Sequence, residues 1–271
     1  MAGSFDDKRE ATEQWTKDPC GLSGASGLEV GTKAFYERVD KNRYEEYAPW
    51  MRSAMGFDGF PGRRLLEVGF GMGTDLFQFA SAGALVSGVD LSPEHLRIAR
   101  QRFAVYGLPA DLRLADAEQL PFSDGSFDVV YTFGVIHHTP DTQKAVDEIH
   151  RVLKPGGLAL ISVYHRNSAF YFVSVLLESY LLRLRFLRES FRRTLSRIEV
   201  RQHSNACPLV KVYTRRSLRR MLGRFTEARI TCMHLSRSDF GLFHRLVPAC
   251  VIRSHALQSR FGWLLNARCI K

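Results

Sequence analysis

The stretch RLLEVGFGMGTDLFQFA, residues 64–80, constrains the fold of this 271-residue chain more than any other part of it. An apolar run leads into three glycines at alternate positions, Gly69, Gly71 and Gly73, and a helical pattern follows them. Glycine adopts backbone conformations that other residues avoid, so this spacing predicts a strand, a tight turn and a helix. Ligands bind at such turns in parallel sheets, because the N-terminus of the helix points at them.

Strands and helices continue to alternate beyond this turn, which predicts a parallel sheet with helices on both faces. Apolar runs typical of strands lie at residues 65–68, 84–89, 110–114, 127–133 and 158–163. Helical patterns lie between them at residues 75–82, 93–106 and 142–153. Ser92 suits the cap of a helix and Pro93 its first turn, while Pro155-Gly156-Gly157 predicts a turn before the fifth strand.

The pattern changes on either side of this region. Residues 1–30 are polar and rich in Gly and Ser, so we expect them to be loosely ordered, whereas residues 32–56 look helical and aromatic. Residues 167–200 predict one long helix with an apolar stripe, formed by Phe170, Val173, Leu177, Leu181, Leu184 and Leu187. A helix and two further strands, the last at residues 263–270, complete the expected pattern.

The residues around the glycine turn separate three candidate ligands. A triphosphate loop needs a lysine after its last glycine, but Thr74 and Asp75 follow Gly73 here. A dinucleotide fingerprint has its third glycine where this chain has Thr74. The pattern E-V-G-x-G-x-G-T-D, followed by Asp90 at the end of the second strand, fits a nucleoside that carries a positive sulfonium. A carboxylate at that distance can accept hydrogen bonds from two ribose hydroxyls.

Four motifs make the chain resemble the class I S-adenosylmethionine-dependent methyltransferases: LLEVGFGMGTD, GVDLS, LADAEQLPFSDGSFDVVYTFGVIHH and EIHRVLKPGGLALIS. It is similar to the subgroup that includes ubiquinone/menaquinone-biosynthesis and natural-product methyltransferases. The match covers residues 65–163 and, more faintly, 213–230. The resemblance implies an α/β fold with a Rossmann-like, doubly wound, mostly parallel seven-stranded sheet. It also implies S-adenosyl-L-methionine as the cofactor and S-adenosyl-L-homocysteine as the product.

The resemblance also implies roles for individual residues. Asp90 binds the ribose, Leu91 packs on adenine, Asp116 and Ala117 hold the adenine edge, and Phe133 borders the methionine moiety. The complete cofactor set implied is Glu67, Gly69, Gly71, Gly73, Asp75, Asp90, Leu91, Asp116, Ala117 and Phe133. Phe70 departs from the small residue or Cys common in relatives, and we expect it to alter packing beside the cofactor without abolishing binding.

Methyl transfer requires alignment, exclusion of water and, where the acceptor loses a proton, a base. His137 and His138 follow the fourth predicted strand and are the candidate catalytic residues, although both can instead fix the loop structurally. Tyr36, Arg38 and Tyr44 are candidates for a lid over the cofactor or acceptor, the alternative being a helix simply packed on the sheet. We expect no metal site.

The net charge of +10 is concentrated in one segment. Residues 183–224 contain 13 Lys and Arg against Glu189 and Glu199, which leaves the rest of the chain near neutral. Three interpretations remain open: a cap in which Phe170 and the stripe cover a hydrophobic acceptor, a basic amphipathic surface for anionic membrane, or a phosphate-binding surface for RNA. A solvated helix face competes with all three. TFGVIHH replaces the N/D-P-P-Y/F motif of base-modifying relatives, which argues against nucleic acid.

These observations divide the chain into an N-terminal segment with a lid helix (residues 1–56), a cofactor-binding core (57–164), a basic helical cap inserted after the fifth strand (165–212) and the rest of the sheet (213–271). We expect methylation of O, N or C of a small, lipophilic metabolite. The alternatives are a membrane-associated quinone or isoprenoid-lipid methyltransferase, an RNA methyltransferase, and a regulatory protein that binds S-adenosylmethionine without turnover. The oligomeric state stays open.

Five scattered cysteines without a C-x-x-C pair indicate a reducing compartment. The N-terminus lacks an apolar signal region, and no uncharged run is long enough to cross a bilayer. We therefore expect a cytoplasmic protein, with contact at the inner membrane face as an option.

Overall fold

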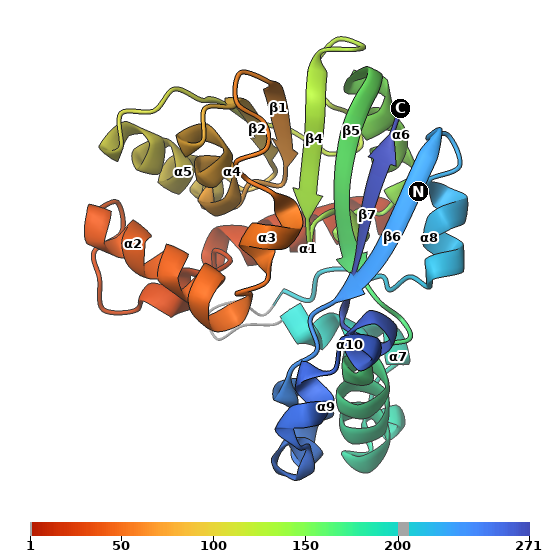
Figure 1. Cartoon of the computed structure of the whole chain (residues 1–271). Helices are drawn as coiled ribbons and strands as arrows, with labels where there is room; N and C mark the ends of the chain where they lie inside the picture. The colour runs from red at the N-terminus through yellow and green to blue at the C-terminus, as the bar shows by residue number, and fades with distance from the viewer. Residues whose placement is uncertain (1, 200–205) are drawn as a thin grey trace.

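The computed structural model describes residues 2–199 and 206–271, and in these residues seven strands form one sheet in the order β3-β2-β1-β4-β5-β7-β6 (Figure 1). The strands are β1 (Arg64–Val68), β2 (Leu85–Asp90), β3 (Asp111–Leu114), β4 (Phe127–Phe133), β5 (Leu153–Tyr164), β6 (Glu227–Met233) and β7 (Leu264–Ile270). β7 is antiparallel to β5 and β6, and the other neighbouring pairs are parallel. The predicted Rossmann-like, mostly parallel seven-stranded sheet is confirmed.

Helices cover both faces of this sheet, as the strand pattern predicts. The main helices of the core are α2 (Lys33–Lys41), α3 (Met51–Met55), α4 (Thr74–Ser81), α5 (Pro93–Val105), α6 (Thr142–Val152) and α8 (Arg215–Met221). Shorter helical turns are η1 (Leu22–Ala25), η2 (Asn42–Tyr47) and η3 (Ile136–His138). Ser92 caps α5 by accepting a hydrogen bond from the His95 amide, and Pro93 occupies its first turn, as expected.

The core consists of two layers because successive side chains of a strand point to opposite faces. Leu66 and Val130 pack in the cluster that contains α6 and α8, whereas Leu65 and Val129 pack in the cluster that contains α3, α4 and α5. The strand order reverses between β1 and β4, which both lie beside one another at the centre of the sheet. Their carboxyl ends therefore form the crevice where open α/β sheets bind ligands.

The expectation that residues 1–30 are loosely ordered is wrong. Residues Ala2–Lys17 form the helix α1, which lies across the carboxyl ends of β1 and β4 (Figure 1). Ala11, Gln14 and Asp18 are buried there. This helix is polar and only weakly amphipathic by sequence, so its order comes from contacts with residues far along the chain.

The single long helix predicted at residues 167–200 is also wrong. The described part of this segment contains η4 (Tyr171–Leu182, a helix of π type), η5 (Arg185–Leu187), α7 (Phe191–Ser196) and η6 (Arg197–Glu199). The break falls at Leu184, whose φ of 54° is left-handed and cannot continue a right-handed helix. The end of the predicted helix, residue 200, lies outside the described residues. A smaller difference concerns Pro155-Gly156-Gly157, which bulges out within β5 opposite β4 instead of preceding the strand.

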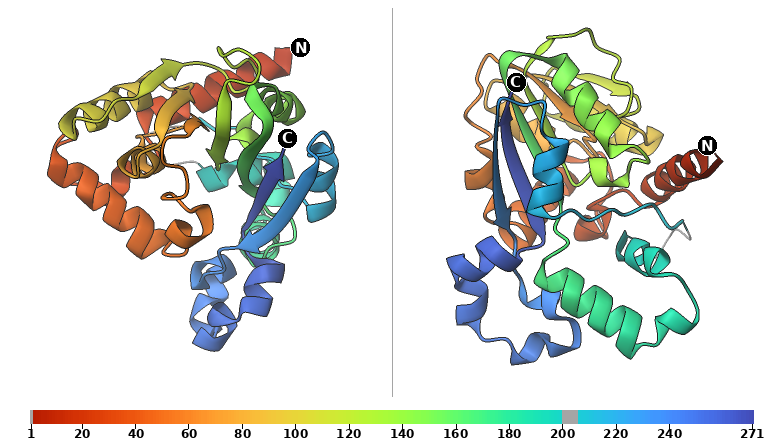
Figure 2. Two further views of the ribbon diagram at one scale, coloured as in Figure 1. Left: turned by 45° about the horizontal axis from the view of Figure 1, so that its top comes forward. Right: turned by 90° about the vertical axis from the view of Figure 1, so that its right-hand side faces the viewer.

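A second helical segment joins this region and was not expected from the sequence. Between β6 and β7 the chain forms η7 (Arg237–Leu246), α9 (Ala249–Arg253) and α10 (His255–Phe261). Together with η4 and η5 these elements form a helical lobe that projects from the sheet at the end where β4 and β5 finish (Figures 1 and 2). Among the described residues no helix is both long and apolar enough to cross a membrane.

Candidate functional site

A cavity of about 380 Å³ lies at the carboxyl ends of β1, β2 and β4. This volume is within the range of small-molecule sites. The glycine turn, the ends of β2 and β4, and the loop after β3 form its floor and walls, and α1 and η2 cover it. The cavity therefore occupies the crevice that the strand order predicts.

The glycine turn shapes one wall of the cavity. Gly69, Gly71 and Gly73 all have positive φ values, of 79°, 53° and 74°. The amide of Gly71 donates a hydrogen bond of 2.9 Å to Oδ2 of Asp90, so the turn is held against the end of β2. No atom lies within 4 Å of the position that a Cβ on Gly71 would take, which leaves this glycine open to the cavity.

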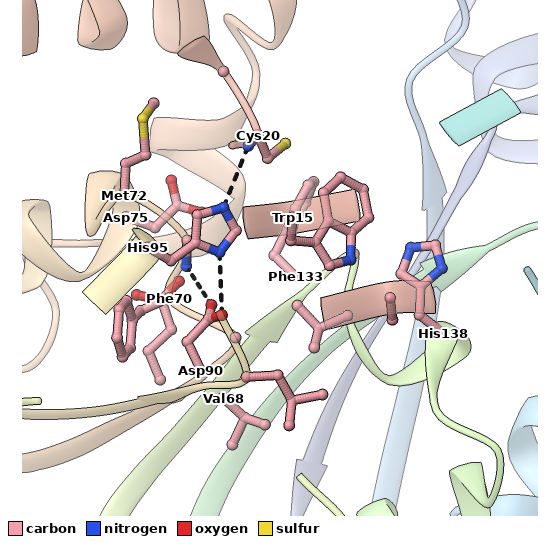
Figure 3. Close-up of a pocket in the computed structure, with 18 of the residues that line it drawn as sticks. Trp15, Cys20, Val68, Phe70, Met72, Asp75, Asp90, His95, Phe133 and His138 are labelled. Atoms are coloured by element: carbon pink, nitrogen blue, oxygen red, sulfur yellow. Dashed lines mark hydrogen bonds and ion pairs between the residues drawn. The ribbon is translucent and has the colours of Figure 1, made fainter. Parts of the chain in front are cut away.

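Asp90 is the centre of a second polar group at the end of β2 (Figure 3). Its Oδ1 accepts a hydrogen bond from the Ser92 amide at 2.9 Å and lies 3.1 Å from Nδ1 of His95. Nε2 of His95 accepts a hydrogen bond from the Cys20 amide at 3.3 Å, so Nδ1 carries the proton of the neutral ring. These contacts and the Gly71 amide hold Asp90 at the cavity wall, and about one acceptor position, on Oδ2, remains for a ligand hydroxyl.

Glu67 supplies an unsatisfied polar atom to the same cavity. Its Oε2 is buried without a hydrogen-bond partner in the described structure. Burial, and then the nearby charge of Asp75, raises the pKa of Glu67 well above its usual value. A buried group of this kind fits a ligand that brings a cation or a hydrogen-bond donor.

Asp75 lines the cavity, but its bonds go to the protein. It accepts hydrogen bonds from Nε and Nη2 of Arg43 at 2.9 and 2.5 Å, and from the hydroxyls of Tyr44 at 2.7 Å and Tyr131 at 2.8 Å. Burial alone would raise the pKa of Asp75, but the charge and hydrogen bonds of Arg43 outweigh it and lower the pKa. Arg43, which the sequence did not single out, is thereby fixed in the cavity wall, 4.9 Å from the ring centre of Phe133.

The predicted lid residues do not reach the cavity. The hydroxyl of Tyr36 is buried and donates to the Ile98 carbonyl at 2.8 Å, while Arg38 is half-buried and pairs with Glu46 at 2.9 Å. Tyr44 donates a hydrogen bond to Asp75, which lines the cavity, but Tyr44 does not line the cavity itself. The side chains of this segment that do line the cavity are Val39, near the end of α2, and Asn42, Arg43 and Tyr47 of η2.

The actual cover is α1, which contributes Lys8, Ala11 and Trp15 to the cavity lining. Nζ of Lys8 pairs with Asp116 at 2.6 Å and with Glu118 at 2.7 Å. Asp116, Ala117 and Leu91 line the cavity. Their role in binding adenine stays a prediction. The ion pair links the N-terminal helix directly to that side of the cavity.

The two candidate histidines separate in the structure. His138 lines the cavity, and its ring lies 5.7 Å from that of Trp15 in an edge-on arrangement (Figure 3). Its Nδ1 lies 2.7 Å from the Leu209 carbonyl. A carbonyl can only accept, so Nδ1 carries the proton and Nε2 of the neutral ring is free to accept one. Nε2 has no hydrogen-bond partner among residues 2–199 and 206–271.

His137 does not support the catalytic prediction. Its ring is fully buried, 3.9 Å from Tyr164 and 4.2 Å from His138, and it does not line the cavity. Burial, and then the neighbouring His138, lowers its pKa well below the usual value, so it is neutral. The direction of its side chain was not predictable from two adjacent histidines, because a turn of η3 sends them to different surroundings.

Aromatic side chains form the part of the cavity near His138. Trp15, Tyr47, Phe133 and Tyr164 line it, and the Tyr164 hydroxyl donates to Glu199 at 2.6 Å. Glu199 is the residue through which the described part of the 165–212 insertion reaches the cavity.

The predicted contact of Phe170 with the acceptor is not observed. The Phe170 ring packs 4.7 Å from Trp263, behind the cavity wall. Phe70, the departure noted in the sequence, is buried beside the cavity and lies 2.7 Å from the position of a Cβ on Gly88, so the large ring is accommodated by a glycine in β2.

Comparison with known proteins agrees with this geometry. Residues 66–161 match a family described as a methyltransferase domain. The chain is 36% identical over 124 residues to a ubiquinone biosynthesis O-methyltransferase of Thiobacillus denitrificans, covering 45% of this chain and 53% of that protein. It is 34% identical over 127 residues to a protein of the same description from Pseudomonas aeruginosa, covering 46% and 55%. The chain thus spans about half the length of the curated relatives it matches.

A solved structure shows the same fold at lower identity. A protein of Methanosarcina mazei described as an S-adenosylmethionine-dependent methyltransferase superposes with a TM-score of 0.55 at 19% identity, covering 80% of this chain and 96% of that one. The matching residues 66–161 include the glycine turn, Asp90 and His138, the groups that surround the cavity. Residues 66–161 of the chain therefore form a methyltransferase domain, with the fold of an S-adenosylmethionine-dependent methyltransferase.

Proposed function

We propose that this protein transfers a methyl group from S-adenosylmethionine to a hydroxyl of a small, flat, lipophilic molecule. The observation that carries the proposal is the position of His138 in the cavity wall. Its Nδ1 is bound to the Leu209 carbonyl, which leaves Nε2 for a ligand, and Trp15 lies between His138 and the Asp90–His95 pair (Figure 3). This arrangement supports a base at one end of the cavity and a nucleoside-binding carboxylate at the other.

The residues at the Asp90 end fit the cofactor. Asp90 accepts a ribose hydroxyl, and the open face of Gly71 allows the ligand to approach the backbone. The unpartnered Oε2 of Glu67 would receive the amino group of the methionine moiety, and Arg43, held by Asp75, would pair with its carboxylate. When bound, the cofactor supplies an electrophilic methyl group on a sulfonium.

The chemistry at the other end is a proton transfer. As the acceptor oxygen bonds to the methyl carbon, the sulfur–methyl bond would break, which leaves S-adenosylhomocysteine, and the hydrogen of the acceptor hydroxyl would move to Nε2 of His138. The Leu209 carbonyl holds the protonated Nδ1, so it fixes the ring orientation and stabilises the imidazolium that results. Such a base contributes about 10²–10⁴-fold to the rate. Trp15 and α1 exclude water from this step.

The aromatic walls support the proposed acceptor class. Trp15, Tyr47, Phe133 and Tyr164 form a largely apolar surface, which suits a flat ring better than a charged polymer. The matched relatives are described as ubiquinone biosynthesis O-methyltransferases, which supports oxygen over nitrogen or carbon as the acceptor atom. A membrane-resident quinone-like acceptor is the narrower version of this proposal, and the exposed apolar and basic side chains of the helical lobe support it.

The RNA alternative loses support because the predicted basic segment does not form one surface. Arg183 and Arg188 lie in the helical lobe, whereas Arg219 and Arg220 lie on α8, beside β6 (Figure 1). Arg185 of the lobe and Arg197 of η6 both pair with Glu189, at 3.1 and 2.9 Å, so one carboxylate partly offsets these two charges. A phosphate backbone needs a continuous positive track.

The first experiment is a label-partition assay. The protein is incubated with methyl-tritiated S-adenosylmethionine and an extract of its source cells, which is then separated into organic-soluble, aqueous small-molecule, RNA and protein fractions. We expect label in the organic fraction that is stable to mild base hydrolysis, as a methyl ether is. Label in the RNA or protein fraction would refute the acceptor class, and no label with intact cofactor binding would leave either an acceptor missing from the extract or the regulatory alternative.

A His138→Ala variant tests the base. We expect turnover to fall about 10²–10⁴-fold while S-adenosylhomocysteine binds with unchanged affinity in calorimetry. His255→Ala is the matched control, because His255 is exposed in α10, away from the cavity. Full turnover by the His138→Ala protein would refute the assignment of His138 as the base, but it would not refute methyl transfer itself.

A further inference from the structure

The helical lobe exposes an apolar surface that the fold does not cover. Most of the large apolar side chains exposed in the described part of the chain lie in two of its segments, η4–η5 and η7. We call this surface the apolar tip: Phe172, Leu177, Leu181, Leu182, Leu184, Phe186, Leu187, Leu242, Phe243 and Leu246. Leu187 is 69% exposed and Leu246 is 78% exposed. Exposed apolar patches of this kind mark interaction sites.

The predicted apolar stripe is therefore turned outward. Tyr171, Val175 and Glu178 are the residues of η4 that are buried, whereas Leu177, Leu181 and Leu184 of the stripe face solvent. These leucines cannot form the cap over an acceptor that the sequence suggested. The spacing of these leucines gives an apolar helix face that is exposed to solvent and not packed in a core.

Buried polar contacts hold the two segments of the tip together. Oε2 of Glu178 accepts a hydrogen bond from the Leu242 amide at 2.9 Å, and Oγ of Ser174 donates to the Asp239 carbonyl at 2.9 Å. A Cβ on Gly241 would overlap the Glu178 carboxylate, so glycine is required at this crossing. The leucines of η4–η5 and η7 therefore belong to one fixed body and not to two independent loops.

The backbone conformation of Leu184 is a second observation that points to a contact outside the molecule. Its φ of 54° is left-handed, and its side chain is 53% exposed. A leucine in this conformation is strained, and it makes no compensating burial within the fold. The strain is understandable if the side chain is buried against something outside the molecule.

The charges around the apolar tip indicate what kind of partner the tip binds. Arg188, Arg237, Arg245 and Arg253 are exposed and have no ion pair with any residue in the described ranges 2–199 and 206–271. The acidic residues of the same segments are withdrawn from the surface, since Glu178 and Asp239 are buried. Leucine and phenylalanine side chains surrounded by unpaired arginines complement an anionic phospholipid surface, where apolar groups enter the acyl region and cations meet the headgroups.

We propose that the apolar tip docks the protein on anionic membrane. The lobe projects from the end of the sheet that carries the cavity, so docking brings the cavity toward the lipid and not away from it (Figures 1 and 2). This inference does not depend on the methyl-transfer proposal, because it concerns a surface outside the cavity. It implies contact from one side of the bilayer only.

Vesicle co-sedimentation of the whole chain tests the proposal. The probes are phosphatidylcholine vesicles, alone or with about a third phosphatidylglycerol, at about 0.1 M and about 0.5 M salt. We expect binding to the anionic vesicles that weakens at high salt, and a partition coefficient at least about tenfold lower for neutral vesicles. Equal sedimentation with and without vesicles would overturn the proposal.

Two variants separate the apolar from the charged contribution. Leu187→Ser/Leu246→Ser should lower the partition coefficient about tenfold or more, because two exposed leucines no longer enter the acyl region. Arg188→Glu/Arg245→Glu should lower binding to anionic vesicles by a similar factor. The matched control is Leu28→Ser, a leucine that is 41% exposed outside the lobe.

The arginine control is Arg220→Glu, since Arg220 is exposed on α8. Unchanged calorimetric binding of S-adenosylhomocysteine confirms that each variant is folded. Equal losses in the tip and control variants would overturn the assignment of the tip. A dimer that dissociates in Leu187→Ser/Leu246→Ser, without vesicle binding by the original protein, would assign the surface to a second copy of the chain.

Discussion

Gly69 and Gly71 lie two residues apart in the same turn, yet the structure predicts that alanine at the two positions fails for different reasons. Both glycines have positive φ, so both substitutions carry the strain of a left-handed backbone, about 1–2 kcal/mol each. The surroundings differ. A Cβ on Gly69 would lie 2.6 Å from Cγ1 and 2.9 Å from Cβ of Val135, whereas a Cβ on Gly71 would meet nothing within 4 Å.

The difference sets the magnitudes. Overlap with a packed side chain adds about 1–3 kcal/mol, so Gly69→Ala should lower the free energy of unfolding by about 2–5 kcal/mol. Gly71→Ala should lower it by about 1–2 kcal/mol. The order reverses for the ligand, because Gly71 lines the cavity with open space in front of it. We expect Gly71→Ala to weaken S-adenosylhomocysteine binding about tenfold or more, since a methyl group then occupies space needed by the ligand.

Urea denaturation and calorimetric titration measure the two effects separately. Val135→Ala removes both γ-carbons that overlap the Gly69 substitution, so Gly69→Ala/Val135→Ala should recover part of the lost stability, with a coupling of about 1 kcal/mol or more. The same second substitution should not rescue Gly71→Ala. Equal destabilisation by the two alanines, or no coupling between Gly69→Ala and Val135→Ala, would refute this account of the turn.

Two further predictions concern charge. Because the pKa of Glu67 is raised, protonation of this carboxyl contributes stability that is complete below its ordinary pKa and is lost as the pH rises through the folded-state pKa. In thermal unfolding, the ligand-free Glu67→Gln variant should therefore gain stability relative to the original protein between pH 5 and pH 8. It should nevertheless bind S-adenosylmethionine more weakly. A constant difference across that pH range would contradict the assignment, and Asp75 does not interfere because its lowered pKa acts below about pH 4. Lys8→Met removes the ion pairs that hold α1 to Asp116 and Glu118, so stopped-flow dissociation of S-adenosylhomocysteine should accelerate about fivefold, as for a partly exposed pair of about 1 kcal/mol. Identical dissociation rates would show that α1 does not gate the cavity.

Local sequence patterns predicted the sheet and its ligand turn because the forces involved act over a few residues. The glycine spacing, the Ser92 cap and the alternation of apolar runs each specify backbone conformation within one or two turns of chain. The strands at residues 65–68 and 127–133 accordingly lie within one residue of those observed. Asp90 ends a strand at a fixed distance from the glycines, so its place in the cavity followed from spacing alone.

Side-chain direction and distant contacts were not predictable in the same way. The polar N-terminus is ordered because Lys8 meets Asp116, more than a hundred residues away, and because Trp15 finds a place over His138. Arg43 and Arg38 look equivalent in sequence, but Arg43 of η2 pairs with Asp75 at the cavity, whereas Arg38 of α2 pairs with Glu46.

The helical lobe shows the limit most clearly. An apolar stripe specifies that a helix has an apolar face, but not whether that face meets a core or a partner. Left-handed Leu184 and the crossing of η4 with η7, through Glu178 and Gly241, decide that it faces outward. The sequence by itself therefore determined the sheet, the glycine turn and the cofactor class, whose signals are local. Only the tertiary structure decided the cover of the cavity, the separation of His137 from His138 and the exposed tip, because these depend on which distant surfaces come into contact.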